Sequence, residues 1–490
     1  PFRQSLLAVC GGRLTPCPCA ERSNVSPNQQ SAATPPMIKT SQPGTSPSGM
    51  MTGMQMKQHQ SGKPYRVLLD ARRHANSGVG RVCQWLVRHL SQGMAGGVQC
   101  VLLLGRHSRD RLWVPADCLA EVECITTDIA PFTDAEYVEL PRLVASLGVD
   151  VYLNPQTTWS PLHTTPSINV VHDLWALVNP QWLPSARDIQ ARFASVGATF
   201  QHALADWLDE ARAASLLTAQ GWQDWQRVQR HGDVVQRAAW AQYAAILAQS
   251  AQVVVVSPHL MAQVDARFAP LAPRTVLTNC PQPLPCTGLQ QPRHWLCLAK
   301  IEPRKNLHHL LDGYALYART VPAGQEPLPL IMAGEQWGTA PGVSLLGRDQ
   351  GLEAQGLAVS FQPSVSDAVL ADLFAHAAAL VSPSLFEGFG FPPLEAMLQL
   401  VPVIAVPTGM LQGPLGAHVR PISGHDPQQL AQALHTVASQ PPDSAHRQQA
   451  RQAVLRCFDA QAHAQAWTDL IRSTAERVRG LTQIKGCGLI

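Results

Sequence analysis

Short apolar runs alternate with segments of helical period through most of this 490-residue chain, and they do so in two series. The runs of the first series lie at residues 66–70, 98–104, 149–153, 167–171 and 252–256. The runs of the second series lie at residues 295–298, 328–332, 357–361, 379–382 and 403–406. Strands that alternate with helices pack as parallel sheets covered by helices. The sequence therefore predicts an α/β fold with two doubly wound, Rossmann-like halves.

A proline-rich connector at residues 279–292 separates the two series and suits a semi-rigid linker. We predict four parts, which are a disordered extension, an N-terminal domain, a C-terminal domain, and a final helix with a tail. Their bounds are 1–63, 64–285, 286–465 and 466–490. The extension is assigned to disorder because Pro, Ser, Thr, Gln, Gly and Met dominate it without any helical or strand period. Two such domains place a ligand cleft at the carboxyl ends of their strands.

An Ala- and Gln-rich stretch at residues 185–250 is predicted to be helical. It contains four tryptophans, which could face an acceptor or a membrane surface. Packing inside a helical hairpin is the more common role for such residues, and we expect it here. The tryptophans are Trp207, Trp222, Trp225 and Trp240.

The most informative segment joins a strand that ends near residue 382 to a helix that starts near residue 392. Residues 387–395 read Glu-Gly-Phe-Gly-Phe-Pro-Pro-Leu-Glu. The amides of a glycine-rich loop and the start of a helix together favour an anion such as a phosphate. The two carboxylates, Glu387 and Glu395, can address different hydroxyls of one ligand. The alternative is a capping loop whose acidic residues merely complement the helix dipole.

A second segment of the same half places basic side chains where a strand gives way to a helix. Lys300, Arg304 and Lys305 lie at this junction, where cations can neutralise a diphosphate. Only six of the 37 Lys and Arg residues are lysines, and these two are the only lysines between residues 64 and 484. The alternative is a solvated charge cluster. We expect Lys305 to be exposed, so that its removal would leave the fold intact.

Two features of the first half follow directly on predicted strands. His172 follows the strand at 167–171, at the end of a parallel strand, where functional side chains gather. A structural histidine is an equal alternative. Gly78 and Gly80 form a turn after the first strand, which would let a ligand approach the backbone. They do not make a nicotinamide fingerprint, because Cys83 stands at the third glycine position.

Several function classes are disfavoured by what the sequence lacks. A net charge of +3 without a dense basic run argues against a nucleic-acid binder. The chain contains no P-loop lysine motif, no HExxH and no GxSxG. It also lacks an Asp-x-Asp pair, which often holds a divalent metal under a diphosphate, so we expect no metal and no cofactor. Lysines and amides would then stabilise the charge on a leaving diphosphate.

Taken together, these segments resemble the retaining glycosyltransferases of GT-B fold that are grouped as family 4. Residues 387–395 are similar to the E-x7-E signature of that family, and residues 299–306 resemble its phosphate-binding segment, G-R-x-x-x-x-K-N. Residues 77–81 resemble its N-terminal glycine loop, and residues 171–174 resemble its histidine segment. There are departures, since Lys300 stands where arginine is usual and Ala299 where glycine is usual.

The resemblance implies a role for each matching residue in binding a nucleotide-sugar donor. Lys300 and Lys305, with Arg304 between them, would bind the diphosphate, and Glu395 would take the ribose hydroxyls. The transferred sugar would be held by four consecutive residues of one loop, which are Glu387 with Gly388 and the amides of Phe389 and Gly390. His172 would contact the sugar near its reacting carbon, and the segment from Gly78 to Gly80 would close over the phosphates.

The resemblance thus implies a GT-B glycosyltransferase whose two domains face a cleft. It would move a hexose from a nucleotide-diphosphate sugar to a glycan or lipid-linked saccharide with retention of anomeric configuration. Two alternatives stay open, a sugar-nucleotide epimerase or phosphorylase of the same fold, and a catalytically silent binding subunit. No apolar run approaches the 18 residues that a membrane span needs, so we expect a cytoplasmic protein that contacts the inner membrane face if its acceptor is lipid-linked.

Overall fold

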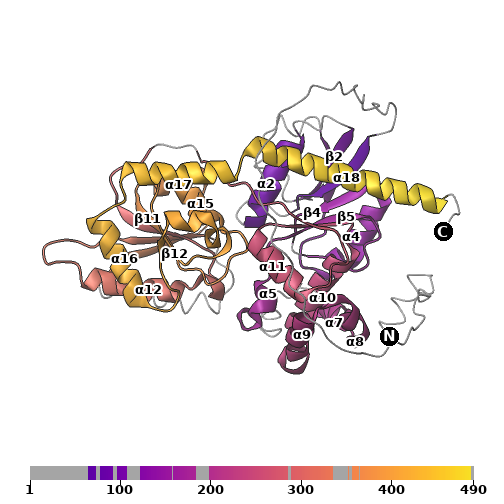
Figure 1. Cartoon of the computed structure of the whole chain (residues 1–490), viewed down its shortest axis with the longest axis horizontal. Coiled ribbons are helices and arrows are strands. Elements are labelled where there is room, and N and C mark those ends of the chain that lie inside the picture. The colour runs from indigo at the N-terminus through magenta and orange to yellow at the C-terminus, as the bar shows by residue number, and fades with distance from the viewer. Residues whose placement is uncertain are drawn as a thin grey trace, which may run out of the picture. The chain divides into compact units, whose positions relative to one another are not determined.

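The computed structural model of the chain describes residues 64–72, 78–91, 97–106, 122–156, 158–183, 198–284, 288–334, 351, 356–363 and 365–486. The predicted extension at 1–63 lies outside these residues. The described residues form two parallel β-sheets with helices packed around each (Figure 1). This arrangement confirms the predicted α/β class with two Rossmann-like halves.

Within the described residues, the first sheet has seven strands in the order β3-β2-β1-β4-β5-β6-β7, and neighbouring strands are parallel. The strands are β1 (Tyr65–Asp70), β2 (Val98–Gly105), β3 (Glu123–Thr127), β4 (Val151–Asn154), β5 (Ser167–Val171), β6 (Gln252–Val255) and β7 (Arg274–Val276). Every residue of β4, β5 and β6 is buried, as expected for parallel strands covered on both faces. The edge strands β3 and β7 were not predicted, because their sequences are short and largely polar.

Helices pack around this sheet. Four of them lie in residues 198–249, as predicted for this stretch, and the predicted part at 185–197 lies outside the described residues. Trp240 and Trp225 are buried, while Trp207 and Trp222 pack against the same core, which supports the packing role over a surface role. The helices are α2 (Gly78–Ser91), α4 (Asp134–Ser146), α5 (Trp175–Val178), η2 (Pro180–Trp182), α7 (Ala198–Trp207), α8 (Glu210–Leu216), α9 (Ala219–His231), α10 (Val234–Gln249) and α11 (Pro258–Arg267).

Among the described residues, the second sheet has six strands in the order β10-β9-β8-β11-β12-β13. Counted within this half, the order is 3-2-1-4-5-6, which is the arrangement of a doubly wound dinucleotide-binding fold. The strands are β8 (His294–Leu298), β9 (Leu330–Gly334), β10 (Val359–Pro363), β11 (Ala377–Ser382), β12 (Val403–Ala405) and β13 (Arg420–Pro421). Neighbouring strands are again parallel.

The helices of the second half end in a long segment that returns to the first sheet. The last helix contacts α2 and β4, and its Arg479 donates to Asp150 Oδ2 at 2.8 Å. The elements are η3 (Pro303–Lys305), α12 (Leu307–Arg319), α14 (Asp367–Ala375), α15 (Phe391–Leu398), η4 (Gly409–Gln412), η5 (Pro414–His418), α16 (Pro427–Ser439), α17 (Ser444–Cys457) and α18 (Ala460–Gly486). The helix α18 therefore completes the N-terminal half, although it is the last element of the chain.

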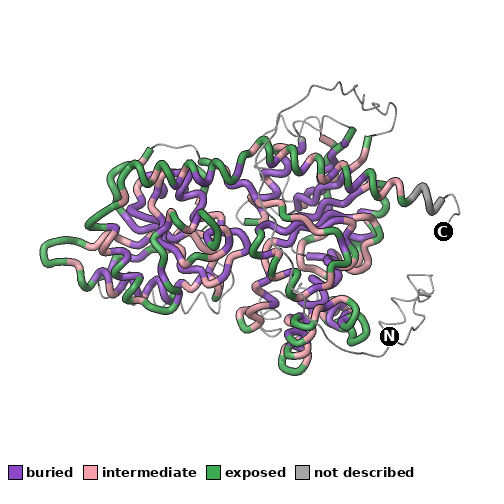
Figure 2. The backbone as a smooth tube through the Cα atoms, viewed as in Figure 1, coloured by how far each residue is buried: buried purple, intermediate pink, exposed green. Residues whose placement is uncertain are grey.

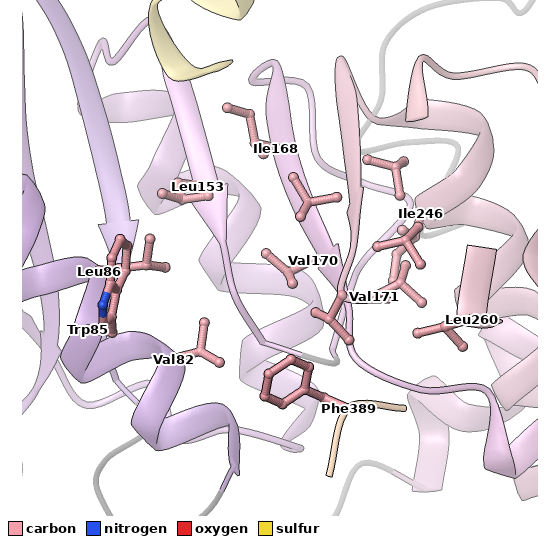
Figure 3. Packing of buried hydrophobic residues seen from close by; sticks show 14 of the residues in the cluster. Val82, Trp85, Leu86, Leu153, Ile168, Val170, Val171, Ile246, Leu260 and Phe389 are labelled. Carbon is pink, nitrogen blue, oxygen red and sulfur yellow. The ribbon is translucent and has the colours of Figure 1, made fainter. Parts of the chain in front are cut away.

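The buried residues form one large cluster with members from both sheets and a smaller one around α12 and α16. Figure 2 marks the buried positions along the backbone. Phe389, from the loop before α15, belongs to the same cluster as Val82, Val171 and Leu260 of the first half (Figure 3). Apolar packing therefore continues from one half into the other beside the loop that carries the predicted sugar-binding residues.

A fully buried ion network closes the carboxyl end of β1. The Arg72 guanidinium donates to Asp70 Oδ2 at 2.7 Å and to Glu136 Oε1 at 2.8 Å, and all three side chains are at most 3% exposed. Asp70 also accepts from the Tyr152 hydroxyl at 2.7 Å, and Glu136 accepts from Thr158 Oγ1 at 3.0 Å. Burial raises the pKa of Glu136, whereas Arg72 outweighs burial and lowers that of Asp70.

Candidate nucleotide-sugar site

The loop between β11 and α15 carries the predicted signature and ends in a residue that starts the helix. Gly390 is the N-cap of α15, with φ 89°, a left-handed conformation that favours glycine. Pro392 and Pro393 follow in the first turn, where proline is tolerated because those amides have no partner within the helix. The two prolines carry no N–H, so the backbone donors next to this helix start are the amides of Gly390 and Phe391, beside the positive end of the helix dipole, an arrangement that favours an anion.

Glu387 is held on this loop by two cations from the predicted basic segment. Lys305 Nζ lies 2.5 Å from Glu387 Oε1, and Arg304 Nη1 lies 3.0 Å from Glu387 Oε2. The side chains of Lys305, Arg304 and Glu387 are 9%, 13% and 12% exposed, so the cluster is shielded from water without being sealed. Burial alone would raise the pKa of Glu387, but Lys305 and Arg304 outweigh it and hold that pKa at about 2.

Backbone contacts position the basic segment against the loop. Residues Pro303–Lys305 form the short helix η3, and Asn306 then turns the chain into α12 with φ 54°. The amide of Leu385 donates to the carbonyl of Arg304 at 2.9 Å, and Asn306 Nδ2 donates to the carbonyl of Gly424 at 2.8 Å. The two predicted segments are therefore joined directly by hydrogen bonds at the carboxyl edge of the second sheet.

Lys305 differs from the prediction in its surroundings, although it lies beside the predicted loop. We expected an exposed side chain, but the residue is only 8% exposed and its ammonium group is paired with Glu387. The expectation was wrong because the default for a lysine is exposure, and the sequence does not reveal a buried carboxylate partner. Lys300 follows β8 and is partly buried, and its carbonyl accepts from the amide of Glu302 at 2.9 Å.

Glu395 is paired with a residue of the other half, not with the lysines. Its carboxylate is 3% exposed and accepts a hydrogen bond from Arg81 Nη1, which lies in the first turn of α2. Gly78 and Gly80 belong to that same first turn, so the predicted glycine turn is a helix start instead. A Cβ built on Gly78 would lie 3.8 Å from the Phe391 ring, which places this turn beside α15.

A second contact between the halves is formed at Gly388. A Cβ at this position would lie 1.7 Å from the carbonyl oxygen of His172, so only glycine fits without movement. The carbonyl of Gly388 accepts from Ser257 Oγ at 2.8 Å, and Ser257 is fully buried at the N-cap of α11. The sugar-binding loop predicted for the second half therefore packs directly against the end of β5.

His172 and Asp173 both lie at this contact, but in different surroundings. The ring Nε2 of His172 lies 2.7 Å from the carbonyl oxygen of Pro155, in its own half. Asp173 lies near the cluster around Glu387. Burial raises its pKa to about 6, opposed by Arg304 and Lys305 and reinforced by the negative charges of Glu302 and Glu387.

Three residues of this region were not assigned from the sequence, namely Arg81, Asp173 and Ser257. Arg81 directly follows the glycine pair and Asp173 directly follows His172, so their positions next to predicted motifs could have identified both residues. Ser257 precedes Pro258, a typical start of a helix, which predicts a cap but no partner from the other half. Among the described residues, no group of three or more His, Cys, Asp or Glu side chains could hold a metal ion.

The half that carries this cluster matches a known protein family. Residues 289–454 match the family model described as Glycosyl transferases group 1. The C-terminal half carries a glycosyl transferases group 1 domain. Both the basic segment and the loop before α15 lie inside this group 1 domain.

Solved structures show the same fold over most of the chain. The structure aligns with sucrose-phosphate synthase from Thermosynechococcus elongatus at a TM-score of 0.57 and 17% identity, covering 84% of this chain and 98% of the other. It also aligns with HepE from Anabaena, solved in complex with UDP and glucose, at a TM-score of 0.55 and 15% identity, covering 84% of this chain and all of the other. The group 1 domain and the N-terminal half together have the GT-B fold.

Curated relatives match a shorter part of the chain. A D-inositol 3-phosphate glycosyltransferase of Streptomyces avermitilis is 31% identical over 199 residues, which are 38% of this chain and 41% of the relative. The serotype-specific mannosyltransferase WbdA of Escherichia coli is 37% identical over 103 residues, which are 21% of this chain and 12% of the relative. The chain spans less than half the length of these relatives. Within the described residues, no helix is long and apolar enough to cross a membrane.

Proposed function

We propose that the chain is a glycosyltransferase that moves a hexose from a nucleoside-diphosphate sugar to a glycan or lipid-linked saccharide, with retention of anomeric configuration as in family 4. The observation that carries the proposal is the pairing of Lys305 and Arg304 with Glu387 at the start of α15. It joins the two segments that resemble the donor site of that family. Both segments lie within residues 289–454, which match the group 1 glycosyl transferases.

In the proposed reaction, the cations of the cluster stabilise the negative charge that develops on the leaving diphosphate. Lys305, Arg304 and Lys300 supply positive charge at the carboxyl edge of β8, and the amides at the start of α15 face the same loop. Donors that are already in position need no reorganisation when the bond to the sugar breaks, so they stabilise the transition state more than the ground state. Phosphate oxygens would replace Glu387 as the partner of Lys305.

Glu387 and Glu395 are proposed to bind the two sugars of the donor. A carboxyl whose pKa is about 2 stays ionised at neutral pH, so Glu387 can accept hydrogen bonds from hydroxyls of the transferred hexose. The amides of Phe389 and Gly390 would assist on the same loop, and His172, whose carbonyl lies against Gly388, would contact the sugar near its reacting carbon. Glu395, further along α15, would accept from the ribose hydroxyls.

We also propose that the reaction needs no metal ion and no cofactor. The reason is that the sequence has no Asp-x-Asp pair to hold a divalent ion under the diphosphate, while lysines and amides lie at the predicted site. Transfer should therefore persist in EDTA. A loss of transfer that added Mg²⁺ or Mn²⁺ restores would contradict this part of the proposal.

The proposed location is the cytoplasm, with peripheral contact at the inner membrane face if the acceptor is lipid-linked. Nucleic acid is not a proposed partner, because the chain has a net charge of only +3 and no dense basic run. Sedimentation with vesicles that carry the acceptor lipid, compared with vesicles that lack it, would test the membrane contact.

The decisive experiment has two steps. A thermal-shift screen with UDP-, GDP- and ADP-sugars identifies the donor, and product analysis then follows with and without a saccharide acceptor. We expect a glycosylated product only when acceptor is present, with the anomeric configuration of the donor by NMR. Product from donor alone would indicate an epimerase, product that requires inorganic phosphate a phosphorylase, and donor binding without any product a silent binding subunit.

A further inference from the structure

The ion pair between Arg81 and Glu395 joins the two halves at a residue that the proposed function assigns to the donor. Arg81 comes from the first turn of α2, and Glu395 from the second turn of α15. The arginine side chain is 30% exposed, whereas the glutamate side chain is 3% exposed. One face of the pair is therefore open to water, and the carboxylate lies behind it.

A ligand cannot reach Glu395 in this arrangement unless the arginine moves. A carboxylate that is 3% exposed offers no surface on which a ribose could dock. A buried carboxylate also needs a partner, because an unpaired buried charge is strongly unfavourable. The two vicinal hydroxyls of a ribose provide two donors for the two carboxylate oxygens, so they can replace a guanidinium as that partner.

We propose that Arg81 occupies the ribose position in the donor-free protein, so that the ribose hydroxyls must displace Arg81 from Glu395 when the donor binds. The proposal rests on the proposed function, because it takes Glu395 as the ribose acceptor. Arg81 is then a specificity-determining residue. It competes with the hydroxyls for Glu395 and so reduces the affinity that they add, whereas a ligand without these hydroxyls leaves the ion pair intact.

The neighbouring contacts indicate where the halves would separate and where they would stay together. Ser257 is fully buried under its bond to Gly388, and the carbonyl of His172 leaves no room for even a Cβ on that glycine. A Cβ added to Gly78 would come only into ordinary van der Waals contact with Phe391, so this side, next to the partly exposed Arg81, is less tightly packed. Displacement of Arg81 would thus loosen the side at α2 while the contact at Gly388 remains.

The test is a thermodynamic cycle in which the Arg81 side chain and the ribose hydroxyls are removed separately and together. Dissociation constants are measured by calorimetry for UDP, GDP and their 2′,3′-dideoxy forms, with the wild-type chain and with Arg81→Met. Loss of an attractive charge at position 81 would affect both forms of a nucleotide alike. The ratio of the dideoxy to the ribose dissociation constant therefore isolates the competition for Glu395.

We expect this ratio to rise by about fivefold in Arg81→Met, because the hydroxyls no longer compete with a partly exposed ion pair. Arg88→Met, an exposed arginine on the same helix, should leave the ratio unchanged. Arg81→Gln keeps a donor for Glu395 without the charge, so the measurement remains possible if the methionine variant is unstable. It should raise the ratio in the same direction.

A ratio that is unchanged or lower in both Arg81 variants would overturn the proposal, because Arg81 would then be independent of the hydroxyls or assist them. A different outcome would refute the proposed function. In that outcome the wild-type chain binds neither UDP nor GDP at millimolar concentration and shows no response to ADP. In that case no ligand would engage Glu395, and the role given to Arg81 would fall with it.

Discussion

Two clusters of arginine and carboxylate stand at the carboxyl edges of the two sheets, and their surroundings differ. In the first half, Asp70, Arg72 and Glu136 are at most 3% exposed, and the protein supplies further partners through Tyr152 and Thr158. In the second half, the side chains that surround Glu387 are 9–13% exposed and stand beside a helix start. The first cluster is closed to solvent and has a structural role, whereas in the second an incoming anion could replace Glu387 as the partner of the cations.

The comparison shows why residue type alone does not separate structural from functional charge. Both clusters hold carboxylates against an arginine with hydrogen bonds of ordinary length. What differs is the access of solvent. The sealed cluster should therefore determine stability, and the open one should determine binding and turnover.

The largest effect is expected from Arg72→Met. Removal of one partner from a buried ion network leaves uncompensated carboxylates, so the free energy of unfolding should fall by about 3–5 kcal/mol. Chemical denaturation of the variant beside Arg106→Met provides the measurement. Arg106 pairs with Asp128, but these side chains are 70% and 63% exposed, so its removal should change stability little. Equal effects of the two variants would remove the distinction between sealed and exposed pairs.

The next effect is expected from Lys305→Met, on activity more than on stability. Loss of one preorganised charge at the leaving diphosphate should lower kcat/KM about a hundredfold, or about 3 kcal/mol in the barrier. Arg304 still pairs with Glu387, so the loss of stability should be smaller than in Arg72→Met. Arg319→Met, at the exposed end of α12, is the control. Turnover at the wild-type rate in a folded Lys305→Met protein would refute the assigned role.

A smaller effect is expected from Glu387→Gln. The amide keeps the size of the side chain but loses the charged acceptor for sugar hydroxyls, so transfer should fall roughly tenfold. Binding of the nucleoside diphosphate without its sugar should stay the same or improve, because Lys305 and Arg304 lose a competing anion. Calorimetry with the nucleotide and a transfer assay separate the two. Weaker nucleotide binding with an unchanged transfer rate would indicate that the roles of Glu387 and Glu395 are reversed.

The smallest effect is a pH dependence that arises from Asp173. Its pKa of about 6 lies above the ordinary value, so its protonated form is favoured in the folded chain and its stabilising contribution is lost as pH rises through 6. Protonation removes a negative charge beside the proposed diphosphate site. Affinity for a nucleotide sugar should thus rise about two- to threefold as pH falls from 7 to 5. Asp173→Asn should abolish this dependence, and a dependence that persists in the variant would assign it to another group.

Most strands could be predicted from the sequence because they are buried on both faces. The predicted run at 167–171 is the strand β5 (Ser167–Val171), and the other predicted runs fall within a few residues of their strands. The strands β3, β7 and β13 were missed, since an edge strand with few buried residues has no apolar run to reveal it.

The candidate site could be predicted only where its members share one sheet edge. Arg304, Lys305 and Glu387 follow neighbouring parallel strands, so the order of the strands brings them together. The pairs Arg81–Glu395 and Ser257–Gly388 depend on how one half meets the other, and local sequence patterns carry no information on that. The burial of Lys305 was missed for a related reason, because its partner lies 82 residues away in the chain.

The chain crosses between the halves twice, and the two crossings touch. The first runs from β7 to β8 and the second from α17 to α18, and Cys280 Sγ on the first lies 3.7 Å from the carbonyl oxygen of Phe458 on the second. A single connection would allow the halves to twist and slide freely. Two adjacent connections leave the halves fewer ways to move relative to each other than one connection would. A C-terminal truncation before α18 would therefore change how the halves can move, even though it removes no residue near the donor.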